Sequence, residues 1–281
     1  MLTVKNLSFS YSKKPFITCM NFHVERGEIF GFLGPSGAGK TTLQKILTGL
    51  ITTYDGSVKL DGIECKEHDN HFYENIGVDF EYSTMYEKLT ARQNLEFFSS
   101  LYAKQTVKID EILADIGLQN DADKKVSDYS KGMKSRLNFL KALLHDPNIL
   151  FLDEPTSGLD PANSQLMKDM ILQQKAKGKT IFLTTHNMAD ATELCDRVAF
   201  IVNGGIKALD SPHNLIMRKG AAKVLYTYYD KHERLGECLL SQISEDNVLA
   251  NLMKENRILS IHSSEPTLND IFIEVTGRTL Q

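Results

Sequence analysis

The most informative stretch of this sequence is Gly34-Pro35-Ser36-Gly37-Ala38-Gly39-Lys40-Thr41. It matches the pattern GxxxxGK followed by Ser or Thr, whose glycines let the backbone wrap so that successive N–H groups point at phosphate oxygens. The apolar run Ile29 to Leu33 precedes it, and a helical pattern from about Thr41 to Leu47 follows. A dinucleotide-binding fingerprint is not matched, because Ser36 occupies the place of its second glycine. The stretch therefore predicts a phosphate-binding loop between a strand and a helix.

The residues at the end of this loop predict how a nucleoside triphosphate and a metal ion would be held. Lys40 would bring a positive charge to the β- and γ-phosphates, and the Thr41 hydroxyl would bind Mg²⁺. The start of the following helix adds a dipole that favours an anion. The predicted cradle consists of Gly34, Pro35, Ser36, Gly37, Ala38, Gly39, Lys40, Thr41 and Thr42.

A second informative stretch is Ile149-Leu150-Phe151-Leu152-Asp153-Glu154, an apolar strand that ends in two acids. Burying a carboxylate is costly unless it is paired or bound to a metal, so these acids are expected to have a role. Asp153 is predicted to hold Mg²⁺ through water, because oxygen ligands suit a hard cation. Glu154 is predicted to be the general base for an attacking water. Side chains alternate along a strand, so the two acids need not share one role.

The order of patterns along the chain predicts an α/β fold. Short apolar strands alternate with helical segments, as in a mostly parallel sheet flanked by helices. Leu2 to Phe9 alternates as an edge strand would, in a predicted antiparallel β subdomain. The helical pattern over about 82–145 predicts a helical subdomain inserted into the core. We expect a core domain over 1–210 and a small α/β accessory region over 211–281, closed by a capped amphipathic helix near Thr267 to Val275.

Composition limits the possible partners. Hydrophobic residues make up 42% and charged residues 24%, and the net charge is -4 with the signs well mixed. These values are ordinary for a globular protein and disfavour a nucleic-acid partner, which would select a basic surface. The longest apolar runs fall short of the roughly 20 residues that cross a bilayer, and the N-terminus lacks a signal-peptide layout. Any work at a membrane is therefore expected to need a separate partner. The cysteines form no CxxC pair, which indicates reduced thiols in a cytosolic protein.

Over about residues 1 to 210 the sequence resembles the ATPases of ABC transporters, which share a P-loop NTPase core. Tyr129-Ser130-Lys131-Gly132-Met133 resembles their signature loop, in a YSxGM variant. Ser157-Gly158-Leu159-Asp160 resembles their D-loop, and His186 resembles the switch histidine that contacts the γ-phosphate. Tyr11 lies where the family stacks an aromatic ring on adenine. The order and spacing of these motifs after the phosphate loop make the resemblance specific.

The resemblance implies that two subunits pair head to tail, with each ATP between the phosphate loop of one and the signature loop of the other. It implies ATP and Mg²⁺ as cofactors, and a partner ATPase subunit that is either a second copy or a related chain. Catalysis would fall to Lys40, Glu154 and His186. The further nucleotide contacts implied are Ser130, Lys131, Gly132 and Met133 of the signature loop, Asp160 of the D-loop, and Tyr11.

One position departs from the family pattern. Aligning Ile76-Gly77-Val78-Asp79-Phe80 puts Glu81 where the family usually has Gln. A Glu can still bind Mg²⁺ through an oxygen, so Glu81 joins Thr41 and Asp153 as a predicted metal ligand. It cannot donate a hydrogen bond when ionised, and it adds negative charge beside a triphosphate.

Two further stretches concern the membrane partner. Tyr82 to Lys88, with Tyr82, Met85 and Tyr86, resembles the surface on which the family binds a cytoplasmic helix of the permease; ordinary packing of the helical subdomain is the alternative. Pro266 to Phe272 resembles the closing segment of ATPases that serve drug, antibiotic-resistance and sodium exporters.

The sequence thus predicts the ATP-hydrolysing subunit of an exporter, attached to the inner face of the cell membrane through a permease. Two alternatives stay open: a soluble ABC ATPase acting in translation or cofactor assembly, and a non-hydrolysing nucleotide sensor. The presence of a base, Glu154, disfavours the sensor.

Overall fold

The computed structural model of the protein describes residues 1–81, 85–104, 106–218, 223–264 and 266–277. The chain divides between Leu209 and Asp210 into two compact units, called here the N-terminal unit and the C-terminal unit. Within the described ranges, every helix is too short or too polar to cross a membrane.

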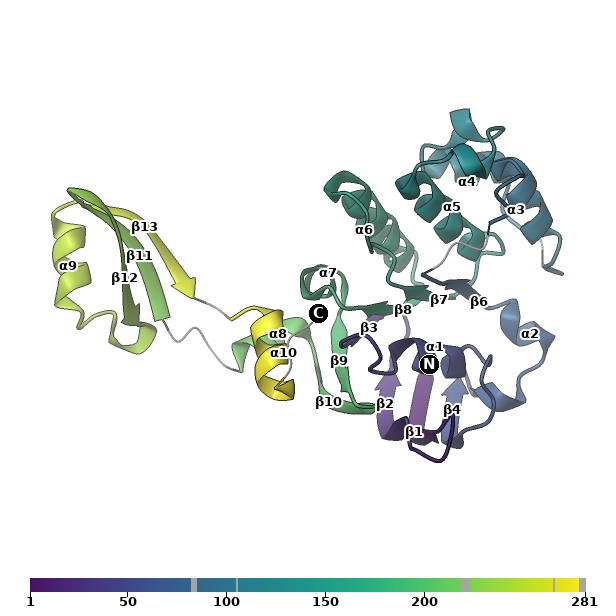
Figure 1. Ribbon diagram of the computed structural model, residues 1–281, viewed down its shortest axis with the longest axis horizontal. Helices are drawn as coiled ribbons and strands as arrows, with labels where there is room; N and C mark the ends of the chain where they lie inside the picture. Colours follow the sequence, from purple (N-terminus) through teal and green to yellow (C-terminus); the bar gives the residue numbers. More distant parts are fainter. Residues whose placement is uncertain (82–84, 105, 219–222, 265, 278–281) are drawn as a thin grey trace. The chain divides into compact units, whose positions relative to one another are not determined.

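A six-stranded sheet lies at the centre of the N-terminal unit (Figure 1). In spatial order its strands are β10 (Gly205–Asp210), β9 (Arg197–Val202), β3 (Ile29–Leu33), β8 (Thr180–Thr185), β7 (Ile149–Asp153) and β6 (Ile76–Asp79). The strands from β9 to β6 pair in parallel. β3, β7 and β8 are buried along their whole length, as strands covered on both faces are. Their carboxyl ends therefore open at one shared edge.

The second sheet of this unit is antiparallel. Its strands, in spatial order, are β2 (Ile17–Val24), β1 (Leu2–Phe9), β4 (Asp55–Leu60) and β5 (Ile63–Glu64). The prediction of an edge strand at the N-terminus is wrong, since β1 pairs with both β2 and β4. One buried apolar cluster joins this sheet to the parallel sheet and to helix α1 (Lys40–Leu47), with Val4, Phe30 and Leu43 among its members.

Helices fill the remaining faces of the N-terminal unit. α6 (Pro161–Ala176) and α7 (Met188–Leu194) follow β7 and β8. Between β6 and β7 the chain forms the helical subdomain, with α3 (Ala91–Ser99), α4 (Ile109–Asp115) and α5 (Lys131–Leu143) (Figure 1). The short helices are α2 (Asn70–Tyr73) and three 3₁₀ turns at Cys65–Glu67, Gln119–Asp121 and Val126–Asp128.

Local signals explain where the helices of this subdomain begin. Thr90 and Gln93 form a capping box at the start of α3, which satisfies free backbone N–H groups reciprocally. Ser130 caps α5, and its hydroxyl accepts a hydrogen bond from the Met133 amide at 3.3 Å. The resembled signature loop therefore continues directly into a helix of the structure.

The C-terminal unit is a small α/β fold of its own. Its elements are α8 (Pro212–Met217), β11 (Lys223–Asp230), β12 (His232–Leu239), a 3₁₀ turn (Leu240–Gln242), α9 (Asn247–Lys254), β13 (Ile258–Ser264) and α10 (Leu268–Thr276). The strands form an antiparallel sheet in the order β12-β11-β13, and Leu249 and Leu252 of α9 pack on its Tyr226. Helix α10 is the capped amphipathic helix expected there, with Thr267 as its cap.

The predicted fold class is confirmed in each of its parts. The parallel core, the antiparallel β subdomain, the inserted helices and the C-terminal α/β appendage are all present. The shared edge of β3, β7 and β8 is where the phosphate loop, Asp153, Glu154 and His186 are attached, because each ends or follows one of these strands.

Candidate functional site

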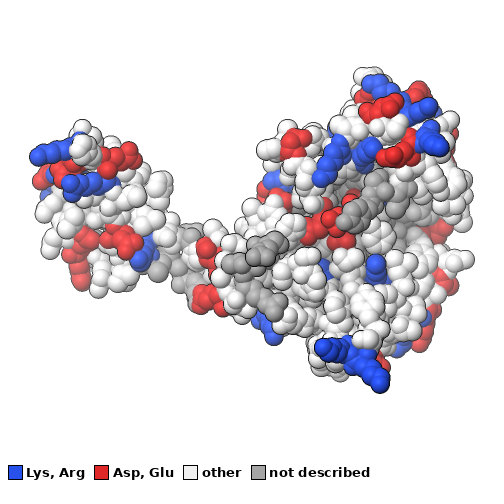
Figure 2. Space-filling view, in the orientation of Figure 1, with Lys and Arg blue, Asp and Glu red and all other residues white. Residues whose placement is uncertain are grey.

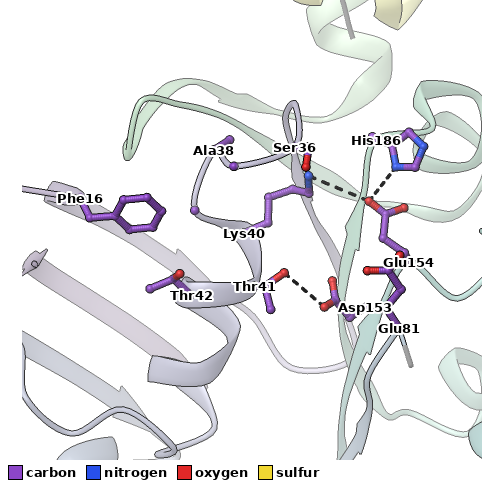
Figure 3. A pocket seen from close by; sticks show the side chains of 12 residues that line it. Phe16, Ser36, Ala38, Lys40, Thr41, Thr42, Glu81, Asp153, Glu154 and His186 are labelled. Carbon is purple, nitrogen blue, oxygen red and sulfur yellow. Dashed lines mark hydrogen bonds and ion pairs between the residues drawn. The ribbon is translucent and has the colours of Figure 1, made fainter. Parts of the chain in front are cut away.

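A pocket of about 260 Å³ opens where the loop after β3 meets the ends of β7 and β8 (Figure 3). The residues that line it are Phe16, Ser36, Gly37, Ala38, Gly39, Lys40, Thr41, Thr42, Glu81, Asp153, Glu154 and His186. Most members of the predicted phosphate cradle thus share one cavity with the three predicted acids. Gly34 and Pro35 lie at the base of the loop, where their carbonyl oxygens accept hydrogen bonds from Lys40.

The glycines of the loop are required by its backbone geometry. Gly39 has φ of 108°, in the region that L side chains rarely adopt, and it is the N-cap of α1. At Gly34, an added Cβ would lie 2.2 Å from the carbonyl oxygen of Ile201. The loop can therefore wrap closely before α1 begins, which leaves the first amides of the helix facing the pocket.

Lys40 is the cation of the pocket. Its Nζ donates to the carbonyl of Gly34 at 2.7 Å and lies 3.9 Å from Oε1 of Glu154 (Figure 3). Burial lowers the pKa of the Lys40 ammonium, while the charges of Glu154, Asp153 and Glu81 oppose this shift. The Lys40 ammonium attracts a multivalent anion. The neighbouring acids would repel that anion, so the site is suited to an anion that arrives with bound cations.

The predicted metal ligands meet on one side of the pocket. The Thr41 hydroxyl donates to Asp153 Oδ2 at 3.3 Å, and Glu81 lines the same cavity. Burial raises the pKa of the Asp153 carboxyl, opposed by hydrogen bonds from Thr184 and Thr41. Within the described ranges, His, Cys, Asp and Glu form no metal-binding group of three or more. One hydroxyl and two carboxylates nevertheless fit Mg²⁺, which prefers few protein oxygens and keeps water and phosphate oxygens as other ligands.

Glu154 has a backbone conformation that is uncommon for a residue with a side chain. It is a non-glycine residue with φ of 51°, and its amide donates to the Thr184 carbonyl at 2.9 Å. Its carboxylate accepts from the Thr185 hydroxyl at 3.1 Å and lies 2.8 Å from Nδ1 of His186. Residues in this conformation are held there by their surroundings and concentrate at functional sites. The geometry directs the carboxylate toward the pocket beside Lys40 (Figure 3).

The sequence-based reasoning missed three residues. Thr184 and Thr185 hydrogen-bond the two acids, and a pair of hydroxyls at the end of a buried strand is a signal that could have found them. The third is Phe16: of the residues that the structure describes, Phe16 lines the pocket and Tyr11 does not. Tyr11 packs edge-on against Phe16 with ring centroids 5.4 Å apart, and its hydroxyl lies 2.9 Å from the Thr42 hydroxyl.

The signature-loop and D-loop residues, all of them described, lie outside this pocket. Asp160 caps α6 and accepts from the Asn163 amide at 3.0 Å. Gly132 packs against Asn163, where a Cβ would approach the side chain to 2.5 Å. Lys131 lines a second cavity, which shares Glu81 and Glu154 with the phosphate pocket. One chain therefore does not bring its own signature loop into the phosphate pocket.

Comparisons with known proteins agree with this geometry. The family model described as "ABC transporter" matches residues 17–157. The chain is 47% identical to a protein of Mycobacterium tuberculosis (strain CDC 1551 / Oshkosh) described as a fluoroquinolones export ATP-binding protein, over 100% of this chain and 94% of that protein. It is 34% identical to the Nod factor export ATP-binding protein I of Rhizobium meliloti (strain 1021), over 100% of this chain and 89% of that protein. A solved ATP-binding subunit of an ABC transporter superposes with a TM-score of 0.70 at 28% identity, covering 78% of this chain and 93% of that one.

Proposed function

The chain belongs to the ABC transporter family of ATP-binding proteins, and we propose that it hydrolyses ATP to power export through a separate membrane permease. One observation carries the catalytic part of the proposal. Lys40, Glu154 and His186 come from three different elements and meet at one pocket, with Glu154 3.9 Å from Lys40 and 2.8 Å from His186. Lys40 is thus a cation suited to bind phosphate, and it lies beside Glu154, a base whose orientation is fixed by His186.

The proposed chemistry follows from how these side chains are held. The Glu154 carboxylate is fixed by Thr185 and His186, and it accepts a proton from the water that attacks the γ-phosphorus. Lys40 stabilises the negative charge on the oxygens of the transferred phosphoryl group. The His186 side chain is half-exposed, so its other ring nitrogen can contact the γ-phosphate while Nδ1 holds Glu154.

Thr41, Asp153 and Glu81 would hold Mg²⁺ in this proposal. The ion would neutralise charge on the phosphate oxygens. The hydroxyls of Thr41 and Thr184 fix the orientation of the Asp153 carboxylate, which already lies at the pocket. Glu81, which lies two residues after the end of β6, lines the same cavity.

We further propose that two ATPase subunits, identical or related, pair head to tail around ATP. Support comes from the position of the α5 N-terminus, whose Ser130, Lys131, Gly132 and Met133 lie outside the chain's own pocket. A helix N-terminus offers free amides and a favourable dipole to an anion, so a partner's bound phosphate would satisfy it. Asp160, at the start of α6, would contact the nucleotide from the same side.

A permease is proposed to dock on an aromatic surface of the helical subdomain. Tyr86 and Phe97 are exposed, and Tyr86 contacts Phe97 and Phe98 with ring centroids 5.2 and 6.1 Å apart. Such a cluster of large side chains suits an apolar helix of a partner. Tyr82, which the sequence places in the same surface, lies outside the described residues. Acidic and basic side chains are intermixed on the face shown in Figure 2, which supports a protein partner over nucleic acid.

Export is supported by the two relatives, which are described as export ATP-binding proteins. It is also supported by the resemblance of Pro266 to Phe272 to the closing segment of exporter ATPases. The chain would then lie peripherally on the cytoplasmic face of the cell membrane. Residues 1–210 would form the ATPase domain and 211–281 the accessory region, a boundary supported by the division of the structure after Leu209.

The first test is copurification from the native host. A tagged Glu154→Gln chain, held with ATP in gently solubilised membranes, should bring down a polytopic membrane protein in stoichiometric amount. Recovery only in the soluble fraction, with ribosomes or assembly factors, would contradict the transporter assignment and favour the soluble alternative.

The second test concerns the dimer. Glu154→Gln should elute as a dimer of ATPase chains with saturating ATP and as a monomer without it, because hydrolysis no longer releases the interface. The matched control is Lys40→Ala combined with Glu154→Gln, which should stay monomeric. A Glu154→Gln protein that stays monomeric in saturating ATP would contradict the head-to-tail arrangement for a homodimer.

A further inference from the structure

A cavity of about 150 Å³ lies between the helical subdomain and α6, and of the described residues that line it none lines the phosphate pocket. Its walls come mainly from α4 and from the C-terminal halves of α5 and α6, and it is called here the α4–α6 cavity. A cavity of this volume with apolar walls can hold an aromatic ring the size of benzene. Buried apolar residues of the lining include Ile112, Ile116, Phe139, Leu140 and Met170.

The α4 side of the α4–α6 cavity is acidic. Glu111 and Asp115 both line it, and because they are four positions apart on one helix they share a face. Glu111 already pairs with Lys108 at 2.9 Å. The Asp115 carboxylate has neither an ion pair nor a hydrogen bond within the part of the chain that the structure describes. Its charge is therefore available to a cation that enters the cavity.

The other charges of the lining leave the balance negative. Asp146, which follows α5, pairs with Lys179, and Lys177 at the end of α6 lines the cavity as well. The pKa of the Asp146 carboxyl is lowered, first by the hydrogen bond from Lys179 and further by charges that include Lys177. Three carboxylates and one ammonium thus line the α4–α6 cavity, which gives a net charge of -2. This excess repels an anion and attracts a cation.

The side-chain amide of Gln174 supplies an independent reason to expect a ligand. Gln174 lines the cavity and is 7% exposed, on the face of α6 that also buries Met170. Within the described ranges this amide has no hydrogen-bond partner, although buried polar side chains nearly always have one. An unpaired buried amide costs free energy, so a ligand that hydrogen-bonds to it is favoured. The carbonyl oxygen of a glutamine accepts from an ammonium N–H.

We propose that the α4–α6 cavity binds a small amphipathic organic amine, a molecule with one aromatic ring and one ammonium group. The ring would lie against Ile112, Phe139 and Met170. The ammonium would donate to the Asp115 carboxylate and to the Gln174 carbonyl. A neutral apolar molecule would leave both polar groups unpaired, and a divalent metal ion needs more oxygen ligands than a largely apolar lining offers. The inference requires neither a permease nor a partner ATPase, so it goes beyond the proposed function.

The rival explanation is that the cavity holds only water. Water can pair with a buried amide, and a cavity of this size has room for a few molecules. The two explanations differ in selectivity. A cavity that holds only water gives no saturable binding and does not distinguish an organic cation from a neutral molecule of the same shape.

The experiment titrates the isolated full chain, without nucleotide, with phenethylamine and follows binding by saturation-transfer NMR. The matched probe is 2-phenylethanol, which has a hydroxyl in place of the ammonium. Phenethylamine should bind with a Kd of about 1–10 mM, the range for a molecule of this size. The Kd for 2-phenylethanol should be about threefold higher or more, because it lacks the charge that pairs with Asp115. A third probe, 3-phenylpropionate, carries the opposite charge and should not bind measurably.

Two variants locate the binding. Asp115→Asn should raise the Kd for phenethylamine about 2- to 5-fold, the range for one exposed ion pair, and leave the Kd for 2-phenylethanol unchanged. Gln174→Leu keeps the volume of the side chain and removes the unpaired amide, so the chain should fold, as circular dichroism checks. It should raise the Kd for phenethylamine about 3- to 10-fold.

Two control variants should keep the affinity for phenethylamine. Asp110→Asn changes another acid of α4 that does not line the cavity. Glu154→Gln changes an acid of the phosphate pocket, which an amine could also enter.

The outcomes are distinct. Saturable, charge-selective binding that weakens in Asp115→Asn and Gln174→Leu, with both controls unchanged, supports the amine site. Equal affinity for phenethylamine and 2-phenylethanol, or binding that does not saturate, overturns it. Wild-type affinity in both cavity variants overturns it as well. Loss of binding in Glu154→Gln would place the amine in the phosphate pocket and likewise overturn the proposal.

Discussion

Two carboxylates of the N-terminal unit are hydrogen-bonded in contrasting ways. Glu64, at the end of β5, accepts from the Tyr54 hydroxyl at 2.7 Å, the Ser57 hydroxyl at 2.6 Å and the Val58 amide at 2.8 Å. Asp153, at the end of β7, accepts from two threonine hydroxyls, the Thr41 contact at 3.3 Å. At both carboxyls burial acts to raise the pKa, and the hydrogen bonds act to lower it. The hydrogen bonds overcome burial at Glu64, whose pKa is lowered, but not at Asp153, whose pKa is raised.

The contrast separates a structural acid from one suited to bind a ligand. Glu64 has fixed donors on β4 and just before it, so its charge is already compensated within the fold. Asp153 is buried with fewer donors, and the adjacent charge of Glu154 raises its pKa further. A carboxylate whose negative charge is only partly compensated by the fold is suited to bind a cation that comes with a ligand or from solvent. The region of β4 and β5 should therefore affect stability, and the phosphate pocket should affect activity.

The largest expected effect is on catalysis. Glu154→Gln keeps the shape of the side chain and removes its ability to accept a proton. We expect kcat for ATP hydrolysis to fall at least about 100-fold, since loss of a general base costs about 10²- to 10⁴-fold. Phosphate release at saturating ATP measures this, with ATP binding checked separately. A kcat within tenfold of the wild type would mean that another group accepts the proton.

Lys40→Ala should have the next largest effect, on ATP affinity. The variant removes the cation nearest Glu154 and should raise the Kd for ATP about 10- to 100-fold, the range for a charged hydrogen bond. Calorimetric titration measures it. The control is Lys66→Ala, which removes the lysine over the Tyr54 ring in the Glu64 region. Equal losses in both variants would remove the distinction between the two regions.

The Glu64→Gln variant tests whether Glu64 is a structural acid. Its amide NH₂ would face donors that now meet a carboxylate, which should cost about 1–3 kcal/mol of the free energy of unfolding at pH 7 without changing kcat. Because the folded pKa of Glu64 lies below the unfolded value of 4.5, this contribution is complete above that pH and is lost as pH falls through the folded pKa. Urea unfolding followed by circular dichroism, at several pH values, measures it. A difference from the wild type that does not shrink in acid would contradict the charge argument.

The Asp153→Asn variant should change the free energy of unfolding in the opposite direction. The folded pKa of Asp153 is raised above the unfolded value of 3.8, so ionisation costs folding free energy at neutral pH. In EDTA and without nucleotide, the variant should be at least as stable as the wild type at pH 7 and should lose that advantage below about pH 3.8. It should also lose ATPase activity. A clear loss of stability at pH 7 would show that Asp153 is a structural acid like Glu64.

The sequence predicts the site best where local spacing determines geometry. The loop from Gly34 to Thr41 carries its own turn and helix start, so its shape follows from its residues. Asp153 and His186 are far apart in the chain, but each ends a buried strand or follows one, and parallel strands end at one edge. The sequence therefore predicts that the two acids, the histidine and the phosphate loop lie together.

Contacts between distant segments could not be predicted in the same way. The alternation of Leu2 to Phe9 reveals one buried face but not how many strands pair with it, so it predicts an edge strand where β1 in fact has two neighbours. The Asn138 amide donates to the Asp79 carboxylate although the two residues are 59 positions apart, and no period links a helix residue to a strand end. The left-handed backbone of Glu154 is imposed by its surroundings and leaves no local signal.

The smallest expected effect distinguishes the two aromatic residues beside the phosphate loop. Phe16→Ala should raise the Kd for ATP about 2- to 10-fold, the range for loss of one aromatic contact, because Phe16 lines the pocket. Tyr11→Ala should have less effect, since Tyr11 acts through its contacts with Phe16 and Thr42. Stacking does not select among bases, so both variants should weaken GTP binding as much as ATP binding. Titration with each nucleotide measures this. A larger loss in Tyr11→Ala would return the adenine contact to Tyr11, as the family resemblance implies.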